Sequence, residues 1–335
     1  MDKRVIVMVW VTLMVLAGSP PAVAAEDEQD FLGIITGDVK STAHQIGMDI
    51  KALVMRSNIH LAVFTSRGSV ENVYAVYQRP GNHMGLVQSD VLAFVAKVDS
   101  DPRLRLIADK IKWVYPLYNQ EIHILGKGEI RLLSDLDDKR VAIGHAESGT
   151  HLTSRLIFEI SGVRPRQMLA ISDSQALAAL KAGSIDAMVT VDGFPVERLV
   201  LEVAPADGLH LIPITHDGIR AFYPASRIPA GSYPWQVADV DTVSVMALLV
   251  AYDFRNHHCK TIGNVGWLIK ENLDWLRFNG HPKWKSVDLG QPVSGWEQYS
   301  CMADFTPAAV EAETESSPTR KPNPVADAIE AVFRP

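Results

Sequence analysis

The sequence predicts an α/β protein in which strands of parallel sheets alternate with helices. Short apolar runs typical of strands are separated by amphipathic runs typical of helices. One turn design also joins a strand to a helix in three places. Alternation of this kind favours parallel sheets with helices on both faces. The 335 residues are enough for two ordinary domains.

The expected helices are recognised by apolar side chains that share one face, as Ile46, Ile50 and Leu53 do. Leu152 and Leu156 mark another helix over residues 152–160. Further helices are expected over residues 70–77, 173–182 and 262–276. The expected strands are residues 32–36, 61–64, 84–88, 122–125, 141–144, 188–191 and 209–213.

The repeated turn places hydroxyl groups and backbone N–H groups at the start of a helix. Its helix-side residues are Ser41 and Thr42 in the first turn, Gly68 and Ser69 in the second, and Ser148, Gly149 and Thr150 in the third. A helix N-terminus has unpaired N–H groups and about half a positive charge, so it can hold a carboxylate or another anion. Such turns gather beyond the carboxyl ends of the strands, where α/β proteins bind ligands. The repetition predicts a protein that grips a small acidic molecule.

The N-terminal residues have the layout of a secretory signal peptide. Lys3 and Arg4 precede an apolar run over residues 5–17, and Ala22 to Ala24 fit a cleavage site. The run is short for a membrane span, and an uncleaved anchor is the alternative. No cysteine follows it closely to carry a lipid. We expect a signal peptide over residues 1–25 and a soluble protein exported to the periplasm. The formal net charge of −7 argues against nucleic acid as a partner.

The two cysteines, Cys259 and Cys301, can be read in three ways. In an exported protein an even number of cysteines favours a disulfide. A metal site with His257 and His258 is the rival, but three adjacent ligands do not converge easily on one ion and the usual zinc spacings are missing. Two free thiols are the third reading. We expect the disulfide and no metal.

The chain lacks the motifs of the common enzyme classes. There is no glycine-rich dinucleotide loop after the first strand, no phosphate loop and no zinc-binding helix motif. Ser148 lies near His145 and His151, but no glycine stands two positions before it, as a nucleophile elbow requires. We therefore expect no catalytic residue, no cofactor and no enzymatic activity. A secreted hydrolase that uses Ser148 is the enzyme alternative.

Two stretches are expected to cross between the domains. Residues 113–126 are apolar and aromatic and include Tyr118, and residues 240–252 form one long β-like run. From residue 303 the chain is rich in Glu, Pro, Thr, Ser and Ala, so we expect a disordered tail over residues 303–335 with a weak helix at 325–333.

Several short motifs occur in a specific order and spacing. They are Gly-Ser-Val-Glu-Asn at 68–72, Gly-Leu-Val-Gln-Ser-Asp at 85–90, the run at 133–144, Ser-Gly-Thr at 148–150, and the runs at 182–187, 228–233, 240–243 and 281–288. Together they resemble the TAXI family, the solute-binding subunits of tripartite ATP-independent periplasmic (TRAP) transporters. The resemblance covers residues 31–302.

The resemblance implies a periplasmic-binding-protein fold of type II, with two α/β lobes of mixed sheets, a hinge and a ligand cleft. Lobe 1 would comprise residues 26–118 and 240–302, and lobe 2 residues 119–239. It also implies a monomer that captures a small carboxylate, such as a glutamate-like amino acid or a dicarboxylate. The solute would pass to a permease driven by an ion gradient. A sensor that presents its ligand to a membrane receptor is the alternative.

The resemblance further implies ligand contacts on both lobes, from Thr36, Ser41, Thr42, Ser69, Asn72, Gln88, Ser89, Asp90, Ser148, Gly149, Thr150, Asp192 and Gly193. Tyr118, in the aromatic stretch between the domains, is a further candidate. Helix capping is the alternative for Ser69 and Asn72, and equally for Ser89 or Asp90. Tyr118 can instead be a core residue, and residues 192–195 a plain turn. Residues 38–44 depart from the glycine-rich loop of the family. They put Asp38 and Lys40 at the cleft edge, where they can change the ligand.

Overall fold

The computed structural model describes residues 31–97 and 102–305. The predicted signal peptide, residues 306–335 of the predicted tail and the expected helix at 325–333 lie outside these ranges. In residues 31–97 and 102–305, no helix has the length and apolar character needed to cross a membrane.

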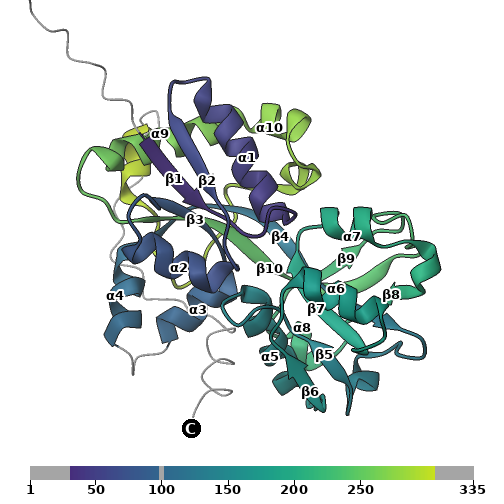
Figure 1. The fold of residues 1–335 in the computed structure, drawn as a ribbon. Coiled ribbons are helices and arrows are strands. Elements are labelled where there is room, and N and C mark those ends of the chain that lie inside the picture. Colours follow the sequence, from purple (N-terminus) through teal and green to yellow (C-terminus); the bar gives the residue numbers. More distant parts are fainter. Residues whose placement is uncertain (1–30, 98–101, 306–335) are drawn as a thin grey trace, which may run out of the picture.

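Two α/β lobes lie side by side and share one curled, ten-stranded sheet (Figure 1). The strand order is β2-β1-β3-β10-β4-β7-β5-β6, with β8 beside β4 and β9 beside β10. β4 and β10 are antiparallel to each other and to β7 and β3, respectively. The predicted architecture of two lobes with mixed sheets is confirmed.

Lobe 1 contains three parallel strands that follow the predicted runs closely. These are β1 (Phe31–Ile35), β2 (His60–Phe64) and β3 (Met84–Gln88). Its helices are α1 (Thr42–Met55), α2 (Ser69–Gln78), α3 (Ser89–Lys97), α4 (Pro102–Lys110), α9 (His257–Glu271) and α10 (Leu273–Asn279). The helix expected over residues 262–276 is therefore two helices. The chain leaves helical geometry at Asn272, with φ −115° and ψ 24°.

Lobe 2 contains a second set of strands and helices. The strands are β5 (Arg140–Ala142), β6 (Gln167–Leu169), β7 (Ala187–Asp192), β8 (Leu209–Leu211) and β9 (Ala225–Ile228). The helices are α5 (Gly149–Ser161), α6 (Asp173–Lys181), α7 (Glu197–Glu202) and α8 (Asp217–Arg220). β6 and β9 were not expected from the sequence, because they are short and largely exposed.

The long strands β4 (Ile111–Lys127) and β10 (Val240–Tyr252) cross between the lobes, as the two apolar stretches predict. β4 pairs with β7 through Glu121–Gly126. β10 pairs with β9 through Val240–Val243 and with β3 through Ala247–Ala251. β10 thus pairs with β9 at its start and with β3 a few residues later, and the lobe boundary expected before residue 240 stays a prediction.

The C-terminal part of the described chain is tied to lobe 1. A disulfide joins Cys259 at the start of α9 to Cys301 in the 3-10 helix η4 (Ser300–Phe305), with the Cα atoms 5.6 Å apart. The predicted disulfide is confirmed. Because η4 extends to Phe305, the first residues of the predicted tail are helical rather than disordered. A second 3-10 helix, η3 (Pro282–Ser286), packs Trp284 into the core formed with α1.

Candidate functional site

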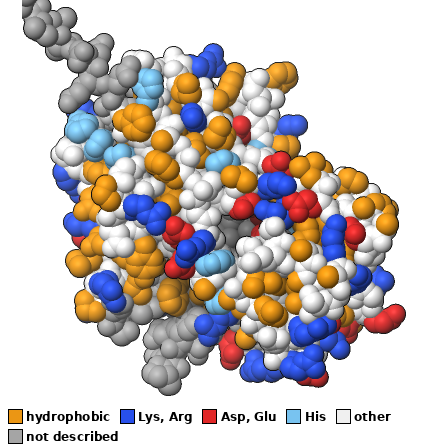
Figure 2. Space-filling view, in the orientation of Figure 1, with side chains coloured by type: hydrophobic (Ala, Val, Ile, Leu, Met, Phe, Trp, Pro, Cys, Tyr) orange, Lys and Arg blue, Asp and Glu red, His pale blue; other side chains and the backbone are white. Residues whose placement is uncertain are grey.

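A cavity of about 220 Å³ lies between the lobes, beyond the carboxyl ends of β1, β2, β3 and β7. Figure 2 shows that acidic and basic side chains gather along the boundary between the lobes, around the hollow. The polar residues that line the cavity are Thr36, Asp38, Ser41, Ser66, Arg67, Ser69, Gln88, Gln120, His145, Ser148, Thr150, Ser172, Asp173, Asp192 and Arg198. Both lobes contribute to this cavity, as a binding cleft requires.

The N-termini of α2 and α5 meet in the wall of the cavity, at the boundary between the lobes. A Cβ atom on Gly68 would lie 3.0 Å from the Cα atom of Ser148. A Cβ atom on Gly149 would lie 1.6 Å from Oε1 of Gln88. The N–H of Glu71 also donates to the carbonyl of Glu147 at 3.1 Å. The lobes can approach this closely because both positions are glycine, and their approach brings two positive helix ends to one place.

Each of these helix ends has its own side-chain arrangement. Oγ of Ser148 accepts from the N–H of His151 at 3.1 Å and donates to the carbonyl of His145 at 2.7 Å. The hydroxyl therefore caps α5, and its proton is held by a backbone carbonyl rather than by a base. Oγ of Ser69 accepts from the N–H of Gln88 at 3.1 Å, which leaves its own proton for another acceptor. Arg67 lies beside them and pairs with Glu147 across the lobes.

Another part of the cavity wall is acidic. Asp38, Asp173 and Asp192 line it, together with Arg198. Arg198 pairs with Asp38 at 2.6 Å and with Glu202 at 3.2 Å, so its charge is offset by two carboxylates. Burial raises the pKa of Asp173, and the charge of Asp38 raises it further. Burial raises the pKa of Asp192 to about 7, although N–H groups of Thr42 and Gly193 hold its carboxylate form.

Two glutamine side chains supply further polar atoms. Gln88 and Gln120 are 4% and 6% exposed, and both line the cavity. In the described part of the chain, Oε1 of each has no hydrogen-bond partner. A buried acceptor without a donor destabilises the protein by about 1–3 kcal/mol. A bound solute with N–H or O–H groups could supply these donors.

The structure brings the larger part of the predicted ligand residues to the cavity wall. They are Thr36, Ser41, Ser69, Gln88, Ser148, Gly149, Thr150 and Asp192. Whether each of them contacts a solute stays a prediction. Thr42, Asn72, Ser89, Asp90, Tyr118 and Gly193 are not among the residues that line this cavity.

These remaining residues make contacts within the protein. Nδ2 of Asn72 donates to the carbonyls of Thr36 and Leu86 and so ties β1 to β3. Oγ of Ser89 accepts from the N–H of Met246 on β10 at 3.3 Å. Tyr118 is a buried residue of the hydrophobic core, as its alternative reading has it, and a ligand contact by its side chain stays a prediction.

Asp90 is a buried contact between the lobes. Its Oδ2 atom accepts from Oγ1 of Thr153 at 2.6 Å and from the hydroxyl of Tyr223 at 3.2 Å. Burial raises the pKa of Asp90 to about 6. Thr42 and Gly193 also contact the opposite lobe, close to the cavity.

Sequence reasoning missed several residues of the wall, among them Arg67, Gln120, Asp173 and Arg198. For Asp173 a signal existed, because Ser172 and Gln175 form a capping box that repeats the strand–turn–helix design a fourth time. For Arg198 there was none. It lies within a short helix, and its position follows only from the packing of the lobes.

Replacing Gly68 by alanine is expected to lower the free energy of unfolding by about 1–3 kcal/mol. Gly68 has φ 132° and ψ −163°, a conformation that side chains disfavour, and its new Cβ atom would press on Ser148. Urea denaturation measures the change. Gly128→Ala is the matched control, since Gly128 has φ +68° and open space around it. Equal losses in the two variants would show that the contact with Ser148 has no effect.

The sequence of this chain matches a known protein family. The profile of the NMT1-like family matches residues 34–290, and the chain belongs to that family. Among solved structures, one described as a periplasmic transporter has a TM-score of 0.52 and 12% identity, over 76% of this chain and 89% of that chain. This similarity confirms the predicted fold of type II periplasmic binding proteins.

Two further solved structures have lower scores. An ancestral arginine-binding protein bound to arginine has a TM-score of 0.47 and 13% identity, over 76% of this chain and 95% of that chain. The alkanesulfonate-binding protein SsuA from Xanthomonas axonopodis pv. citri, bound to MOPS, has a TM-score of 0.44 and 14% identity, over 76% of this chain and 78% of that chain.

Proposed function

We propose that this NMT1-like protein is a periplasmic solute-binding protein without catalytic activity, and that it captures a small carboxylate-bearing solute by closure of its lobes. The observation that carries the proposal is the pair of helix N-termini, of α2 and α5, that meet at the boundary between the lobes in the wall of a cavity lined by both lobes. The arrangement of Ser148 supports a binding role rather than hydrolysis, since its proton is donated to a backbone carbonyl.

The charges of the cavity favour a glutamate-like amino acid over a dicarboxylate. A carboxylate would lie at the end formed by α2, α5 and Arg67. An ammonium group would lie at the acidic end, near Asp173 and Asp38, where a second carboxylate would be repelled. A micromolar dissociation constant corresponds to about −8 kcal/mol, which a few charge-assisted hydrogen bonds in a water-excluded site can supply.

We further propose that the protein is exported through its signal peptide, works as a monomer and delivers solute to a TRAP permease. The order and spacing of the TAXI-like motifs support this assignment. A permease gene beside the gene for this chain is the expected observation. A sensor kinase gene in that place would instead indicate ligand sensing.

Isothermal titration calorimetry tests the solute class. The protein is unfolded and refolded first, so that co-purified solute is removed. L-glutamate and L-glutamine are expected to bind with micromolar dissociation constants, whereas succinate and butylamine, which each carry one kind of charge, are expected to bind more weakly. Binding of succinate in preference to both amino acids would contradict the zwitterion assignment. The absence of any binder from a broad panel of amino acids and carboxylates would contradict the proposed function.

Replacing Ser148 by alanine is expected to weaken solute binding roughly tenfold, because the cap fixes the N–H groups at the start of α5. The stability should fall by about 1 kcal/mol, so the fold is retained. Ser161→Ala is the matched control at the other end of α5, where the hydroxyl donates to the carbonyl of Phe158 and accepts from the N–H of Val163. The dissociation constants of the variants for L-glutamate measure the effect. Equal affinities for the Ser148 and Ser161 variants would contradict a role of this helix end.

A further inference from the structure

Beside the cavity, the lobes are joined by a seam between residues 38–45 of lobe 1 and residues 192–202 of lobe 2. Its contacts run from Thr42 to Asp192 and Gly193, from Gln45 to Glu197, from Lys40 to Glu202 and from Asp38 to Arg198. Each has a donor–acceptor distance between 2.6 and 2.9 Å. The seam therefore connects the first turn of α1 with the end of β7 and with α7.

The centre of the seam is the carboxyl group of Asp192 on the N-terminus of α1. The N–H of Thr42, the first residue of α1, donates to Oδ2 of Asp192 at 2.9 Å. Oγ1 of Thr42 donates to the carbonyl of Gly193 at 2.6 Å. Both partners are buried. The helix end that sequence patterns assign to a solute anion is thus occupied by a carboxyl group of the protein itself.

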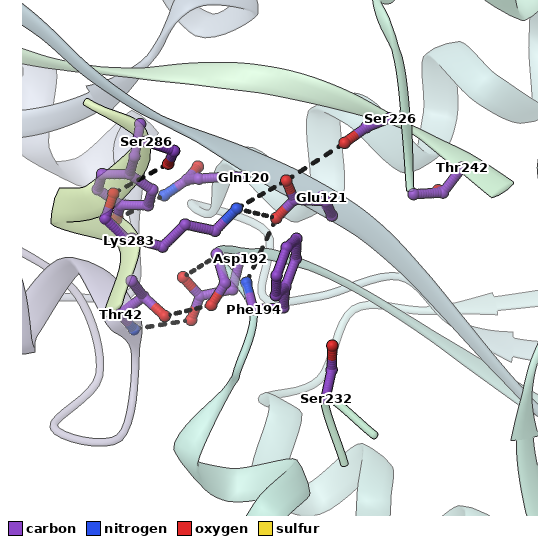
Figure 3. A network of polar contacts seen from close by, with 12 residues as sticks. Thr42, Gln120, Glu121, Asp192, Phe194, Ser226, Ser232, Thr242, Lys283 and Ser286 are labelled. Atoms are coloured by element: carbon purple, nitrogen blue, oxygen red, sulfur yellow. Dashed lines mark hydrogen bonds and ion pairs between the residues drawn. The ribbon is translucent and has the colours of Figure 1, made fainter. Parts of the chain in front are cut away.

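The loop that carries Asp192 is also held from its other side. Nζ of Lys283, in η3 of lobe 1, lies 2.7 Å from Glu121 and 3.9 Å from the centre of the Phe194 ring. Glu121 accepts in turn from the N–H of Phe194 at 3.3 Å. Figure 3 shows Thr42 and Lys283 on either side of the loop formed by Asp192 and Phe194. A loop of lobe 2 is therefore lodged between two elements of lobe 1.

The contacts of the seam differ in strength. Lys40 and Glu202 are partly exposed, and an ion pair of this kind contributes little because water and salt screen it. The contacts of Thr42 are shielded from water by both lobes, so their loss on opening is felt more strongly. Among the contacts of the seam, those of Asp192 and Thr42 should therefore contribute most to the preference for the closed arrangement.

We infer that this seam is a latch, in which contacts between the lobes stabilise the closed arrangement without help from the solute and Asp192 is the positioning residue. The latch adds two properties to the proposed function. The N-terminus of α1 serves lobe closure and leaves the solute anion to α2 and α5. The protein also has a measurable closed population when it holds no solute.

Distances between spin labels in solute-free protein test the latch. Labels are attached through M55C on α1 and M168C on β6, both exposed positions on opposite lobes, after unfolding and refolding to remove any solute. The otherwise unsubstituted protein is expected to show a short-distance population. Asp192→Ala should reduce the ratio of closed to open molecules about tenfold or more. Asp192→Asn keeps one oxygen that can accept from the N–H of Thr42, although it loses the bond from the N–H of Gly193, and should keep the short distance.

Thr42→Pro gives a second, independent variant. Proline is well tolerated at the first residue of a helix, and Ser41 has φ −81° and ψ 149°, which suits a residue before proline. The substitution removes both donors to the loop and should open the lobes as Asp192→Ala does, while circular dichroism shows an unchanged helix content. Lys40→Ala is the matched control for the exposed pair and should change the ratio less than twofold.

The inference is overturned if the unsubstituted protein shows only the open distance, or if Asp192→Ala and Thr42→Pro leave the ratio unchanged. Because no solute is added, these outcomes do not depend on which solute the cavity takes. The calorimetric panel can therefore fail while the latch holds, and the latch can fail while solute binding is found.

Discussion

Replacing Lys283 by methionine is expected to lower the free energy of unfolding by about 3–5 kcal/mol, because it leaves Glu121 charged and unpaired in the protein interior. The side chains of Lys283 and Glu121 are only 5% and 3% exposed, and their charged atoms are 2.7 Å apart. Burial raises the pKa of Glu121 and lowers the pKa of Lys283, while each partner's charge opposes the shift of the other. Urea denaturation at pH 7 measures the loss.

Two further variants separate pairing from packing. The double variant Lys283→Met with Glu121→Gln removes both charges and should recover a large part of the lost stability. Arg227→Met is the matched control, since Arg227 pairs with Asp241 at 2.9 Å on the surface and should contribute less than about 1 kcal/mol. A loss for Lys283→Met no larger than that of Arg227→Met would contradict the prediction.

Replacing Asp192 by asparagine is expected to remove a pH dependence of roughly 4 kcal/mol between pH 4 and pH 7. Burial raises the pKa of Asp192 from 3.8 to about 7 in the folded protein, and one unit of pKa corresponds to about 1.4 kcal/mol. Because the folded pKa is the higher one, the stabilisation is complete below the unfolded pKa and is lost as the pH rises through the folded pKa. Asparagine resembles the protonated side chain and does not titrate.

The measurement is the difference in free energy of unfolding between the Asp192→Asn variant and the unsubstituted protein. It should grow from pH 4 to pH 7 in favour of the variant and stay constant above that range. The charge of Asp173 adds to the shift, whereas the N–H groups of Thr42 and Gly193 oppose it. Contributions shared by both proteins cancel, including that of His123, whose pKa burial lowers to about 4. A difference that stays constant from pH 4 to pH 8 would contradict the assignment.

The fold could be predicted largely because its buried strands are distinct in sequence. β3 and β10 match the predicted runs at both ends, since both are buried along almost their whole length. The short strand β6 could not be predicted in the same way. Gln167 and Met168 are exposed there, so no apolar pattern marks it.

The candidate site could be predicted only in part, because local patterns show which helix ends exist but not what occupies them. The turn before α1 was identified from Ser41 and Thr42, and Ser41 indeed caps that helix. The carboxyl group on the same helix end comes from Asp192, 150 residues further along the chain. In the sequence, the run around Lys283 indicates only a family resemblance. Glu121, the partner of Lys283, lies 162 residues away in the chain.

The two strands that cross between the lobes have a mechanical consequence. β4 and β10 run unbroken from one lobe to the other and are paired with each other at the crossing, with irregular register between Met246 and Leu248. We therefore expect the proposed movement of the lobes to twist one continuous sheet rather than to turn on a free linker. Because the paired strands keep the two lobes in the same relative alignment, we expect each closure to bring Thr42 back to Asp192 and not to a neighbouring residue.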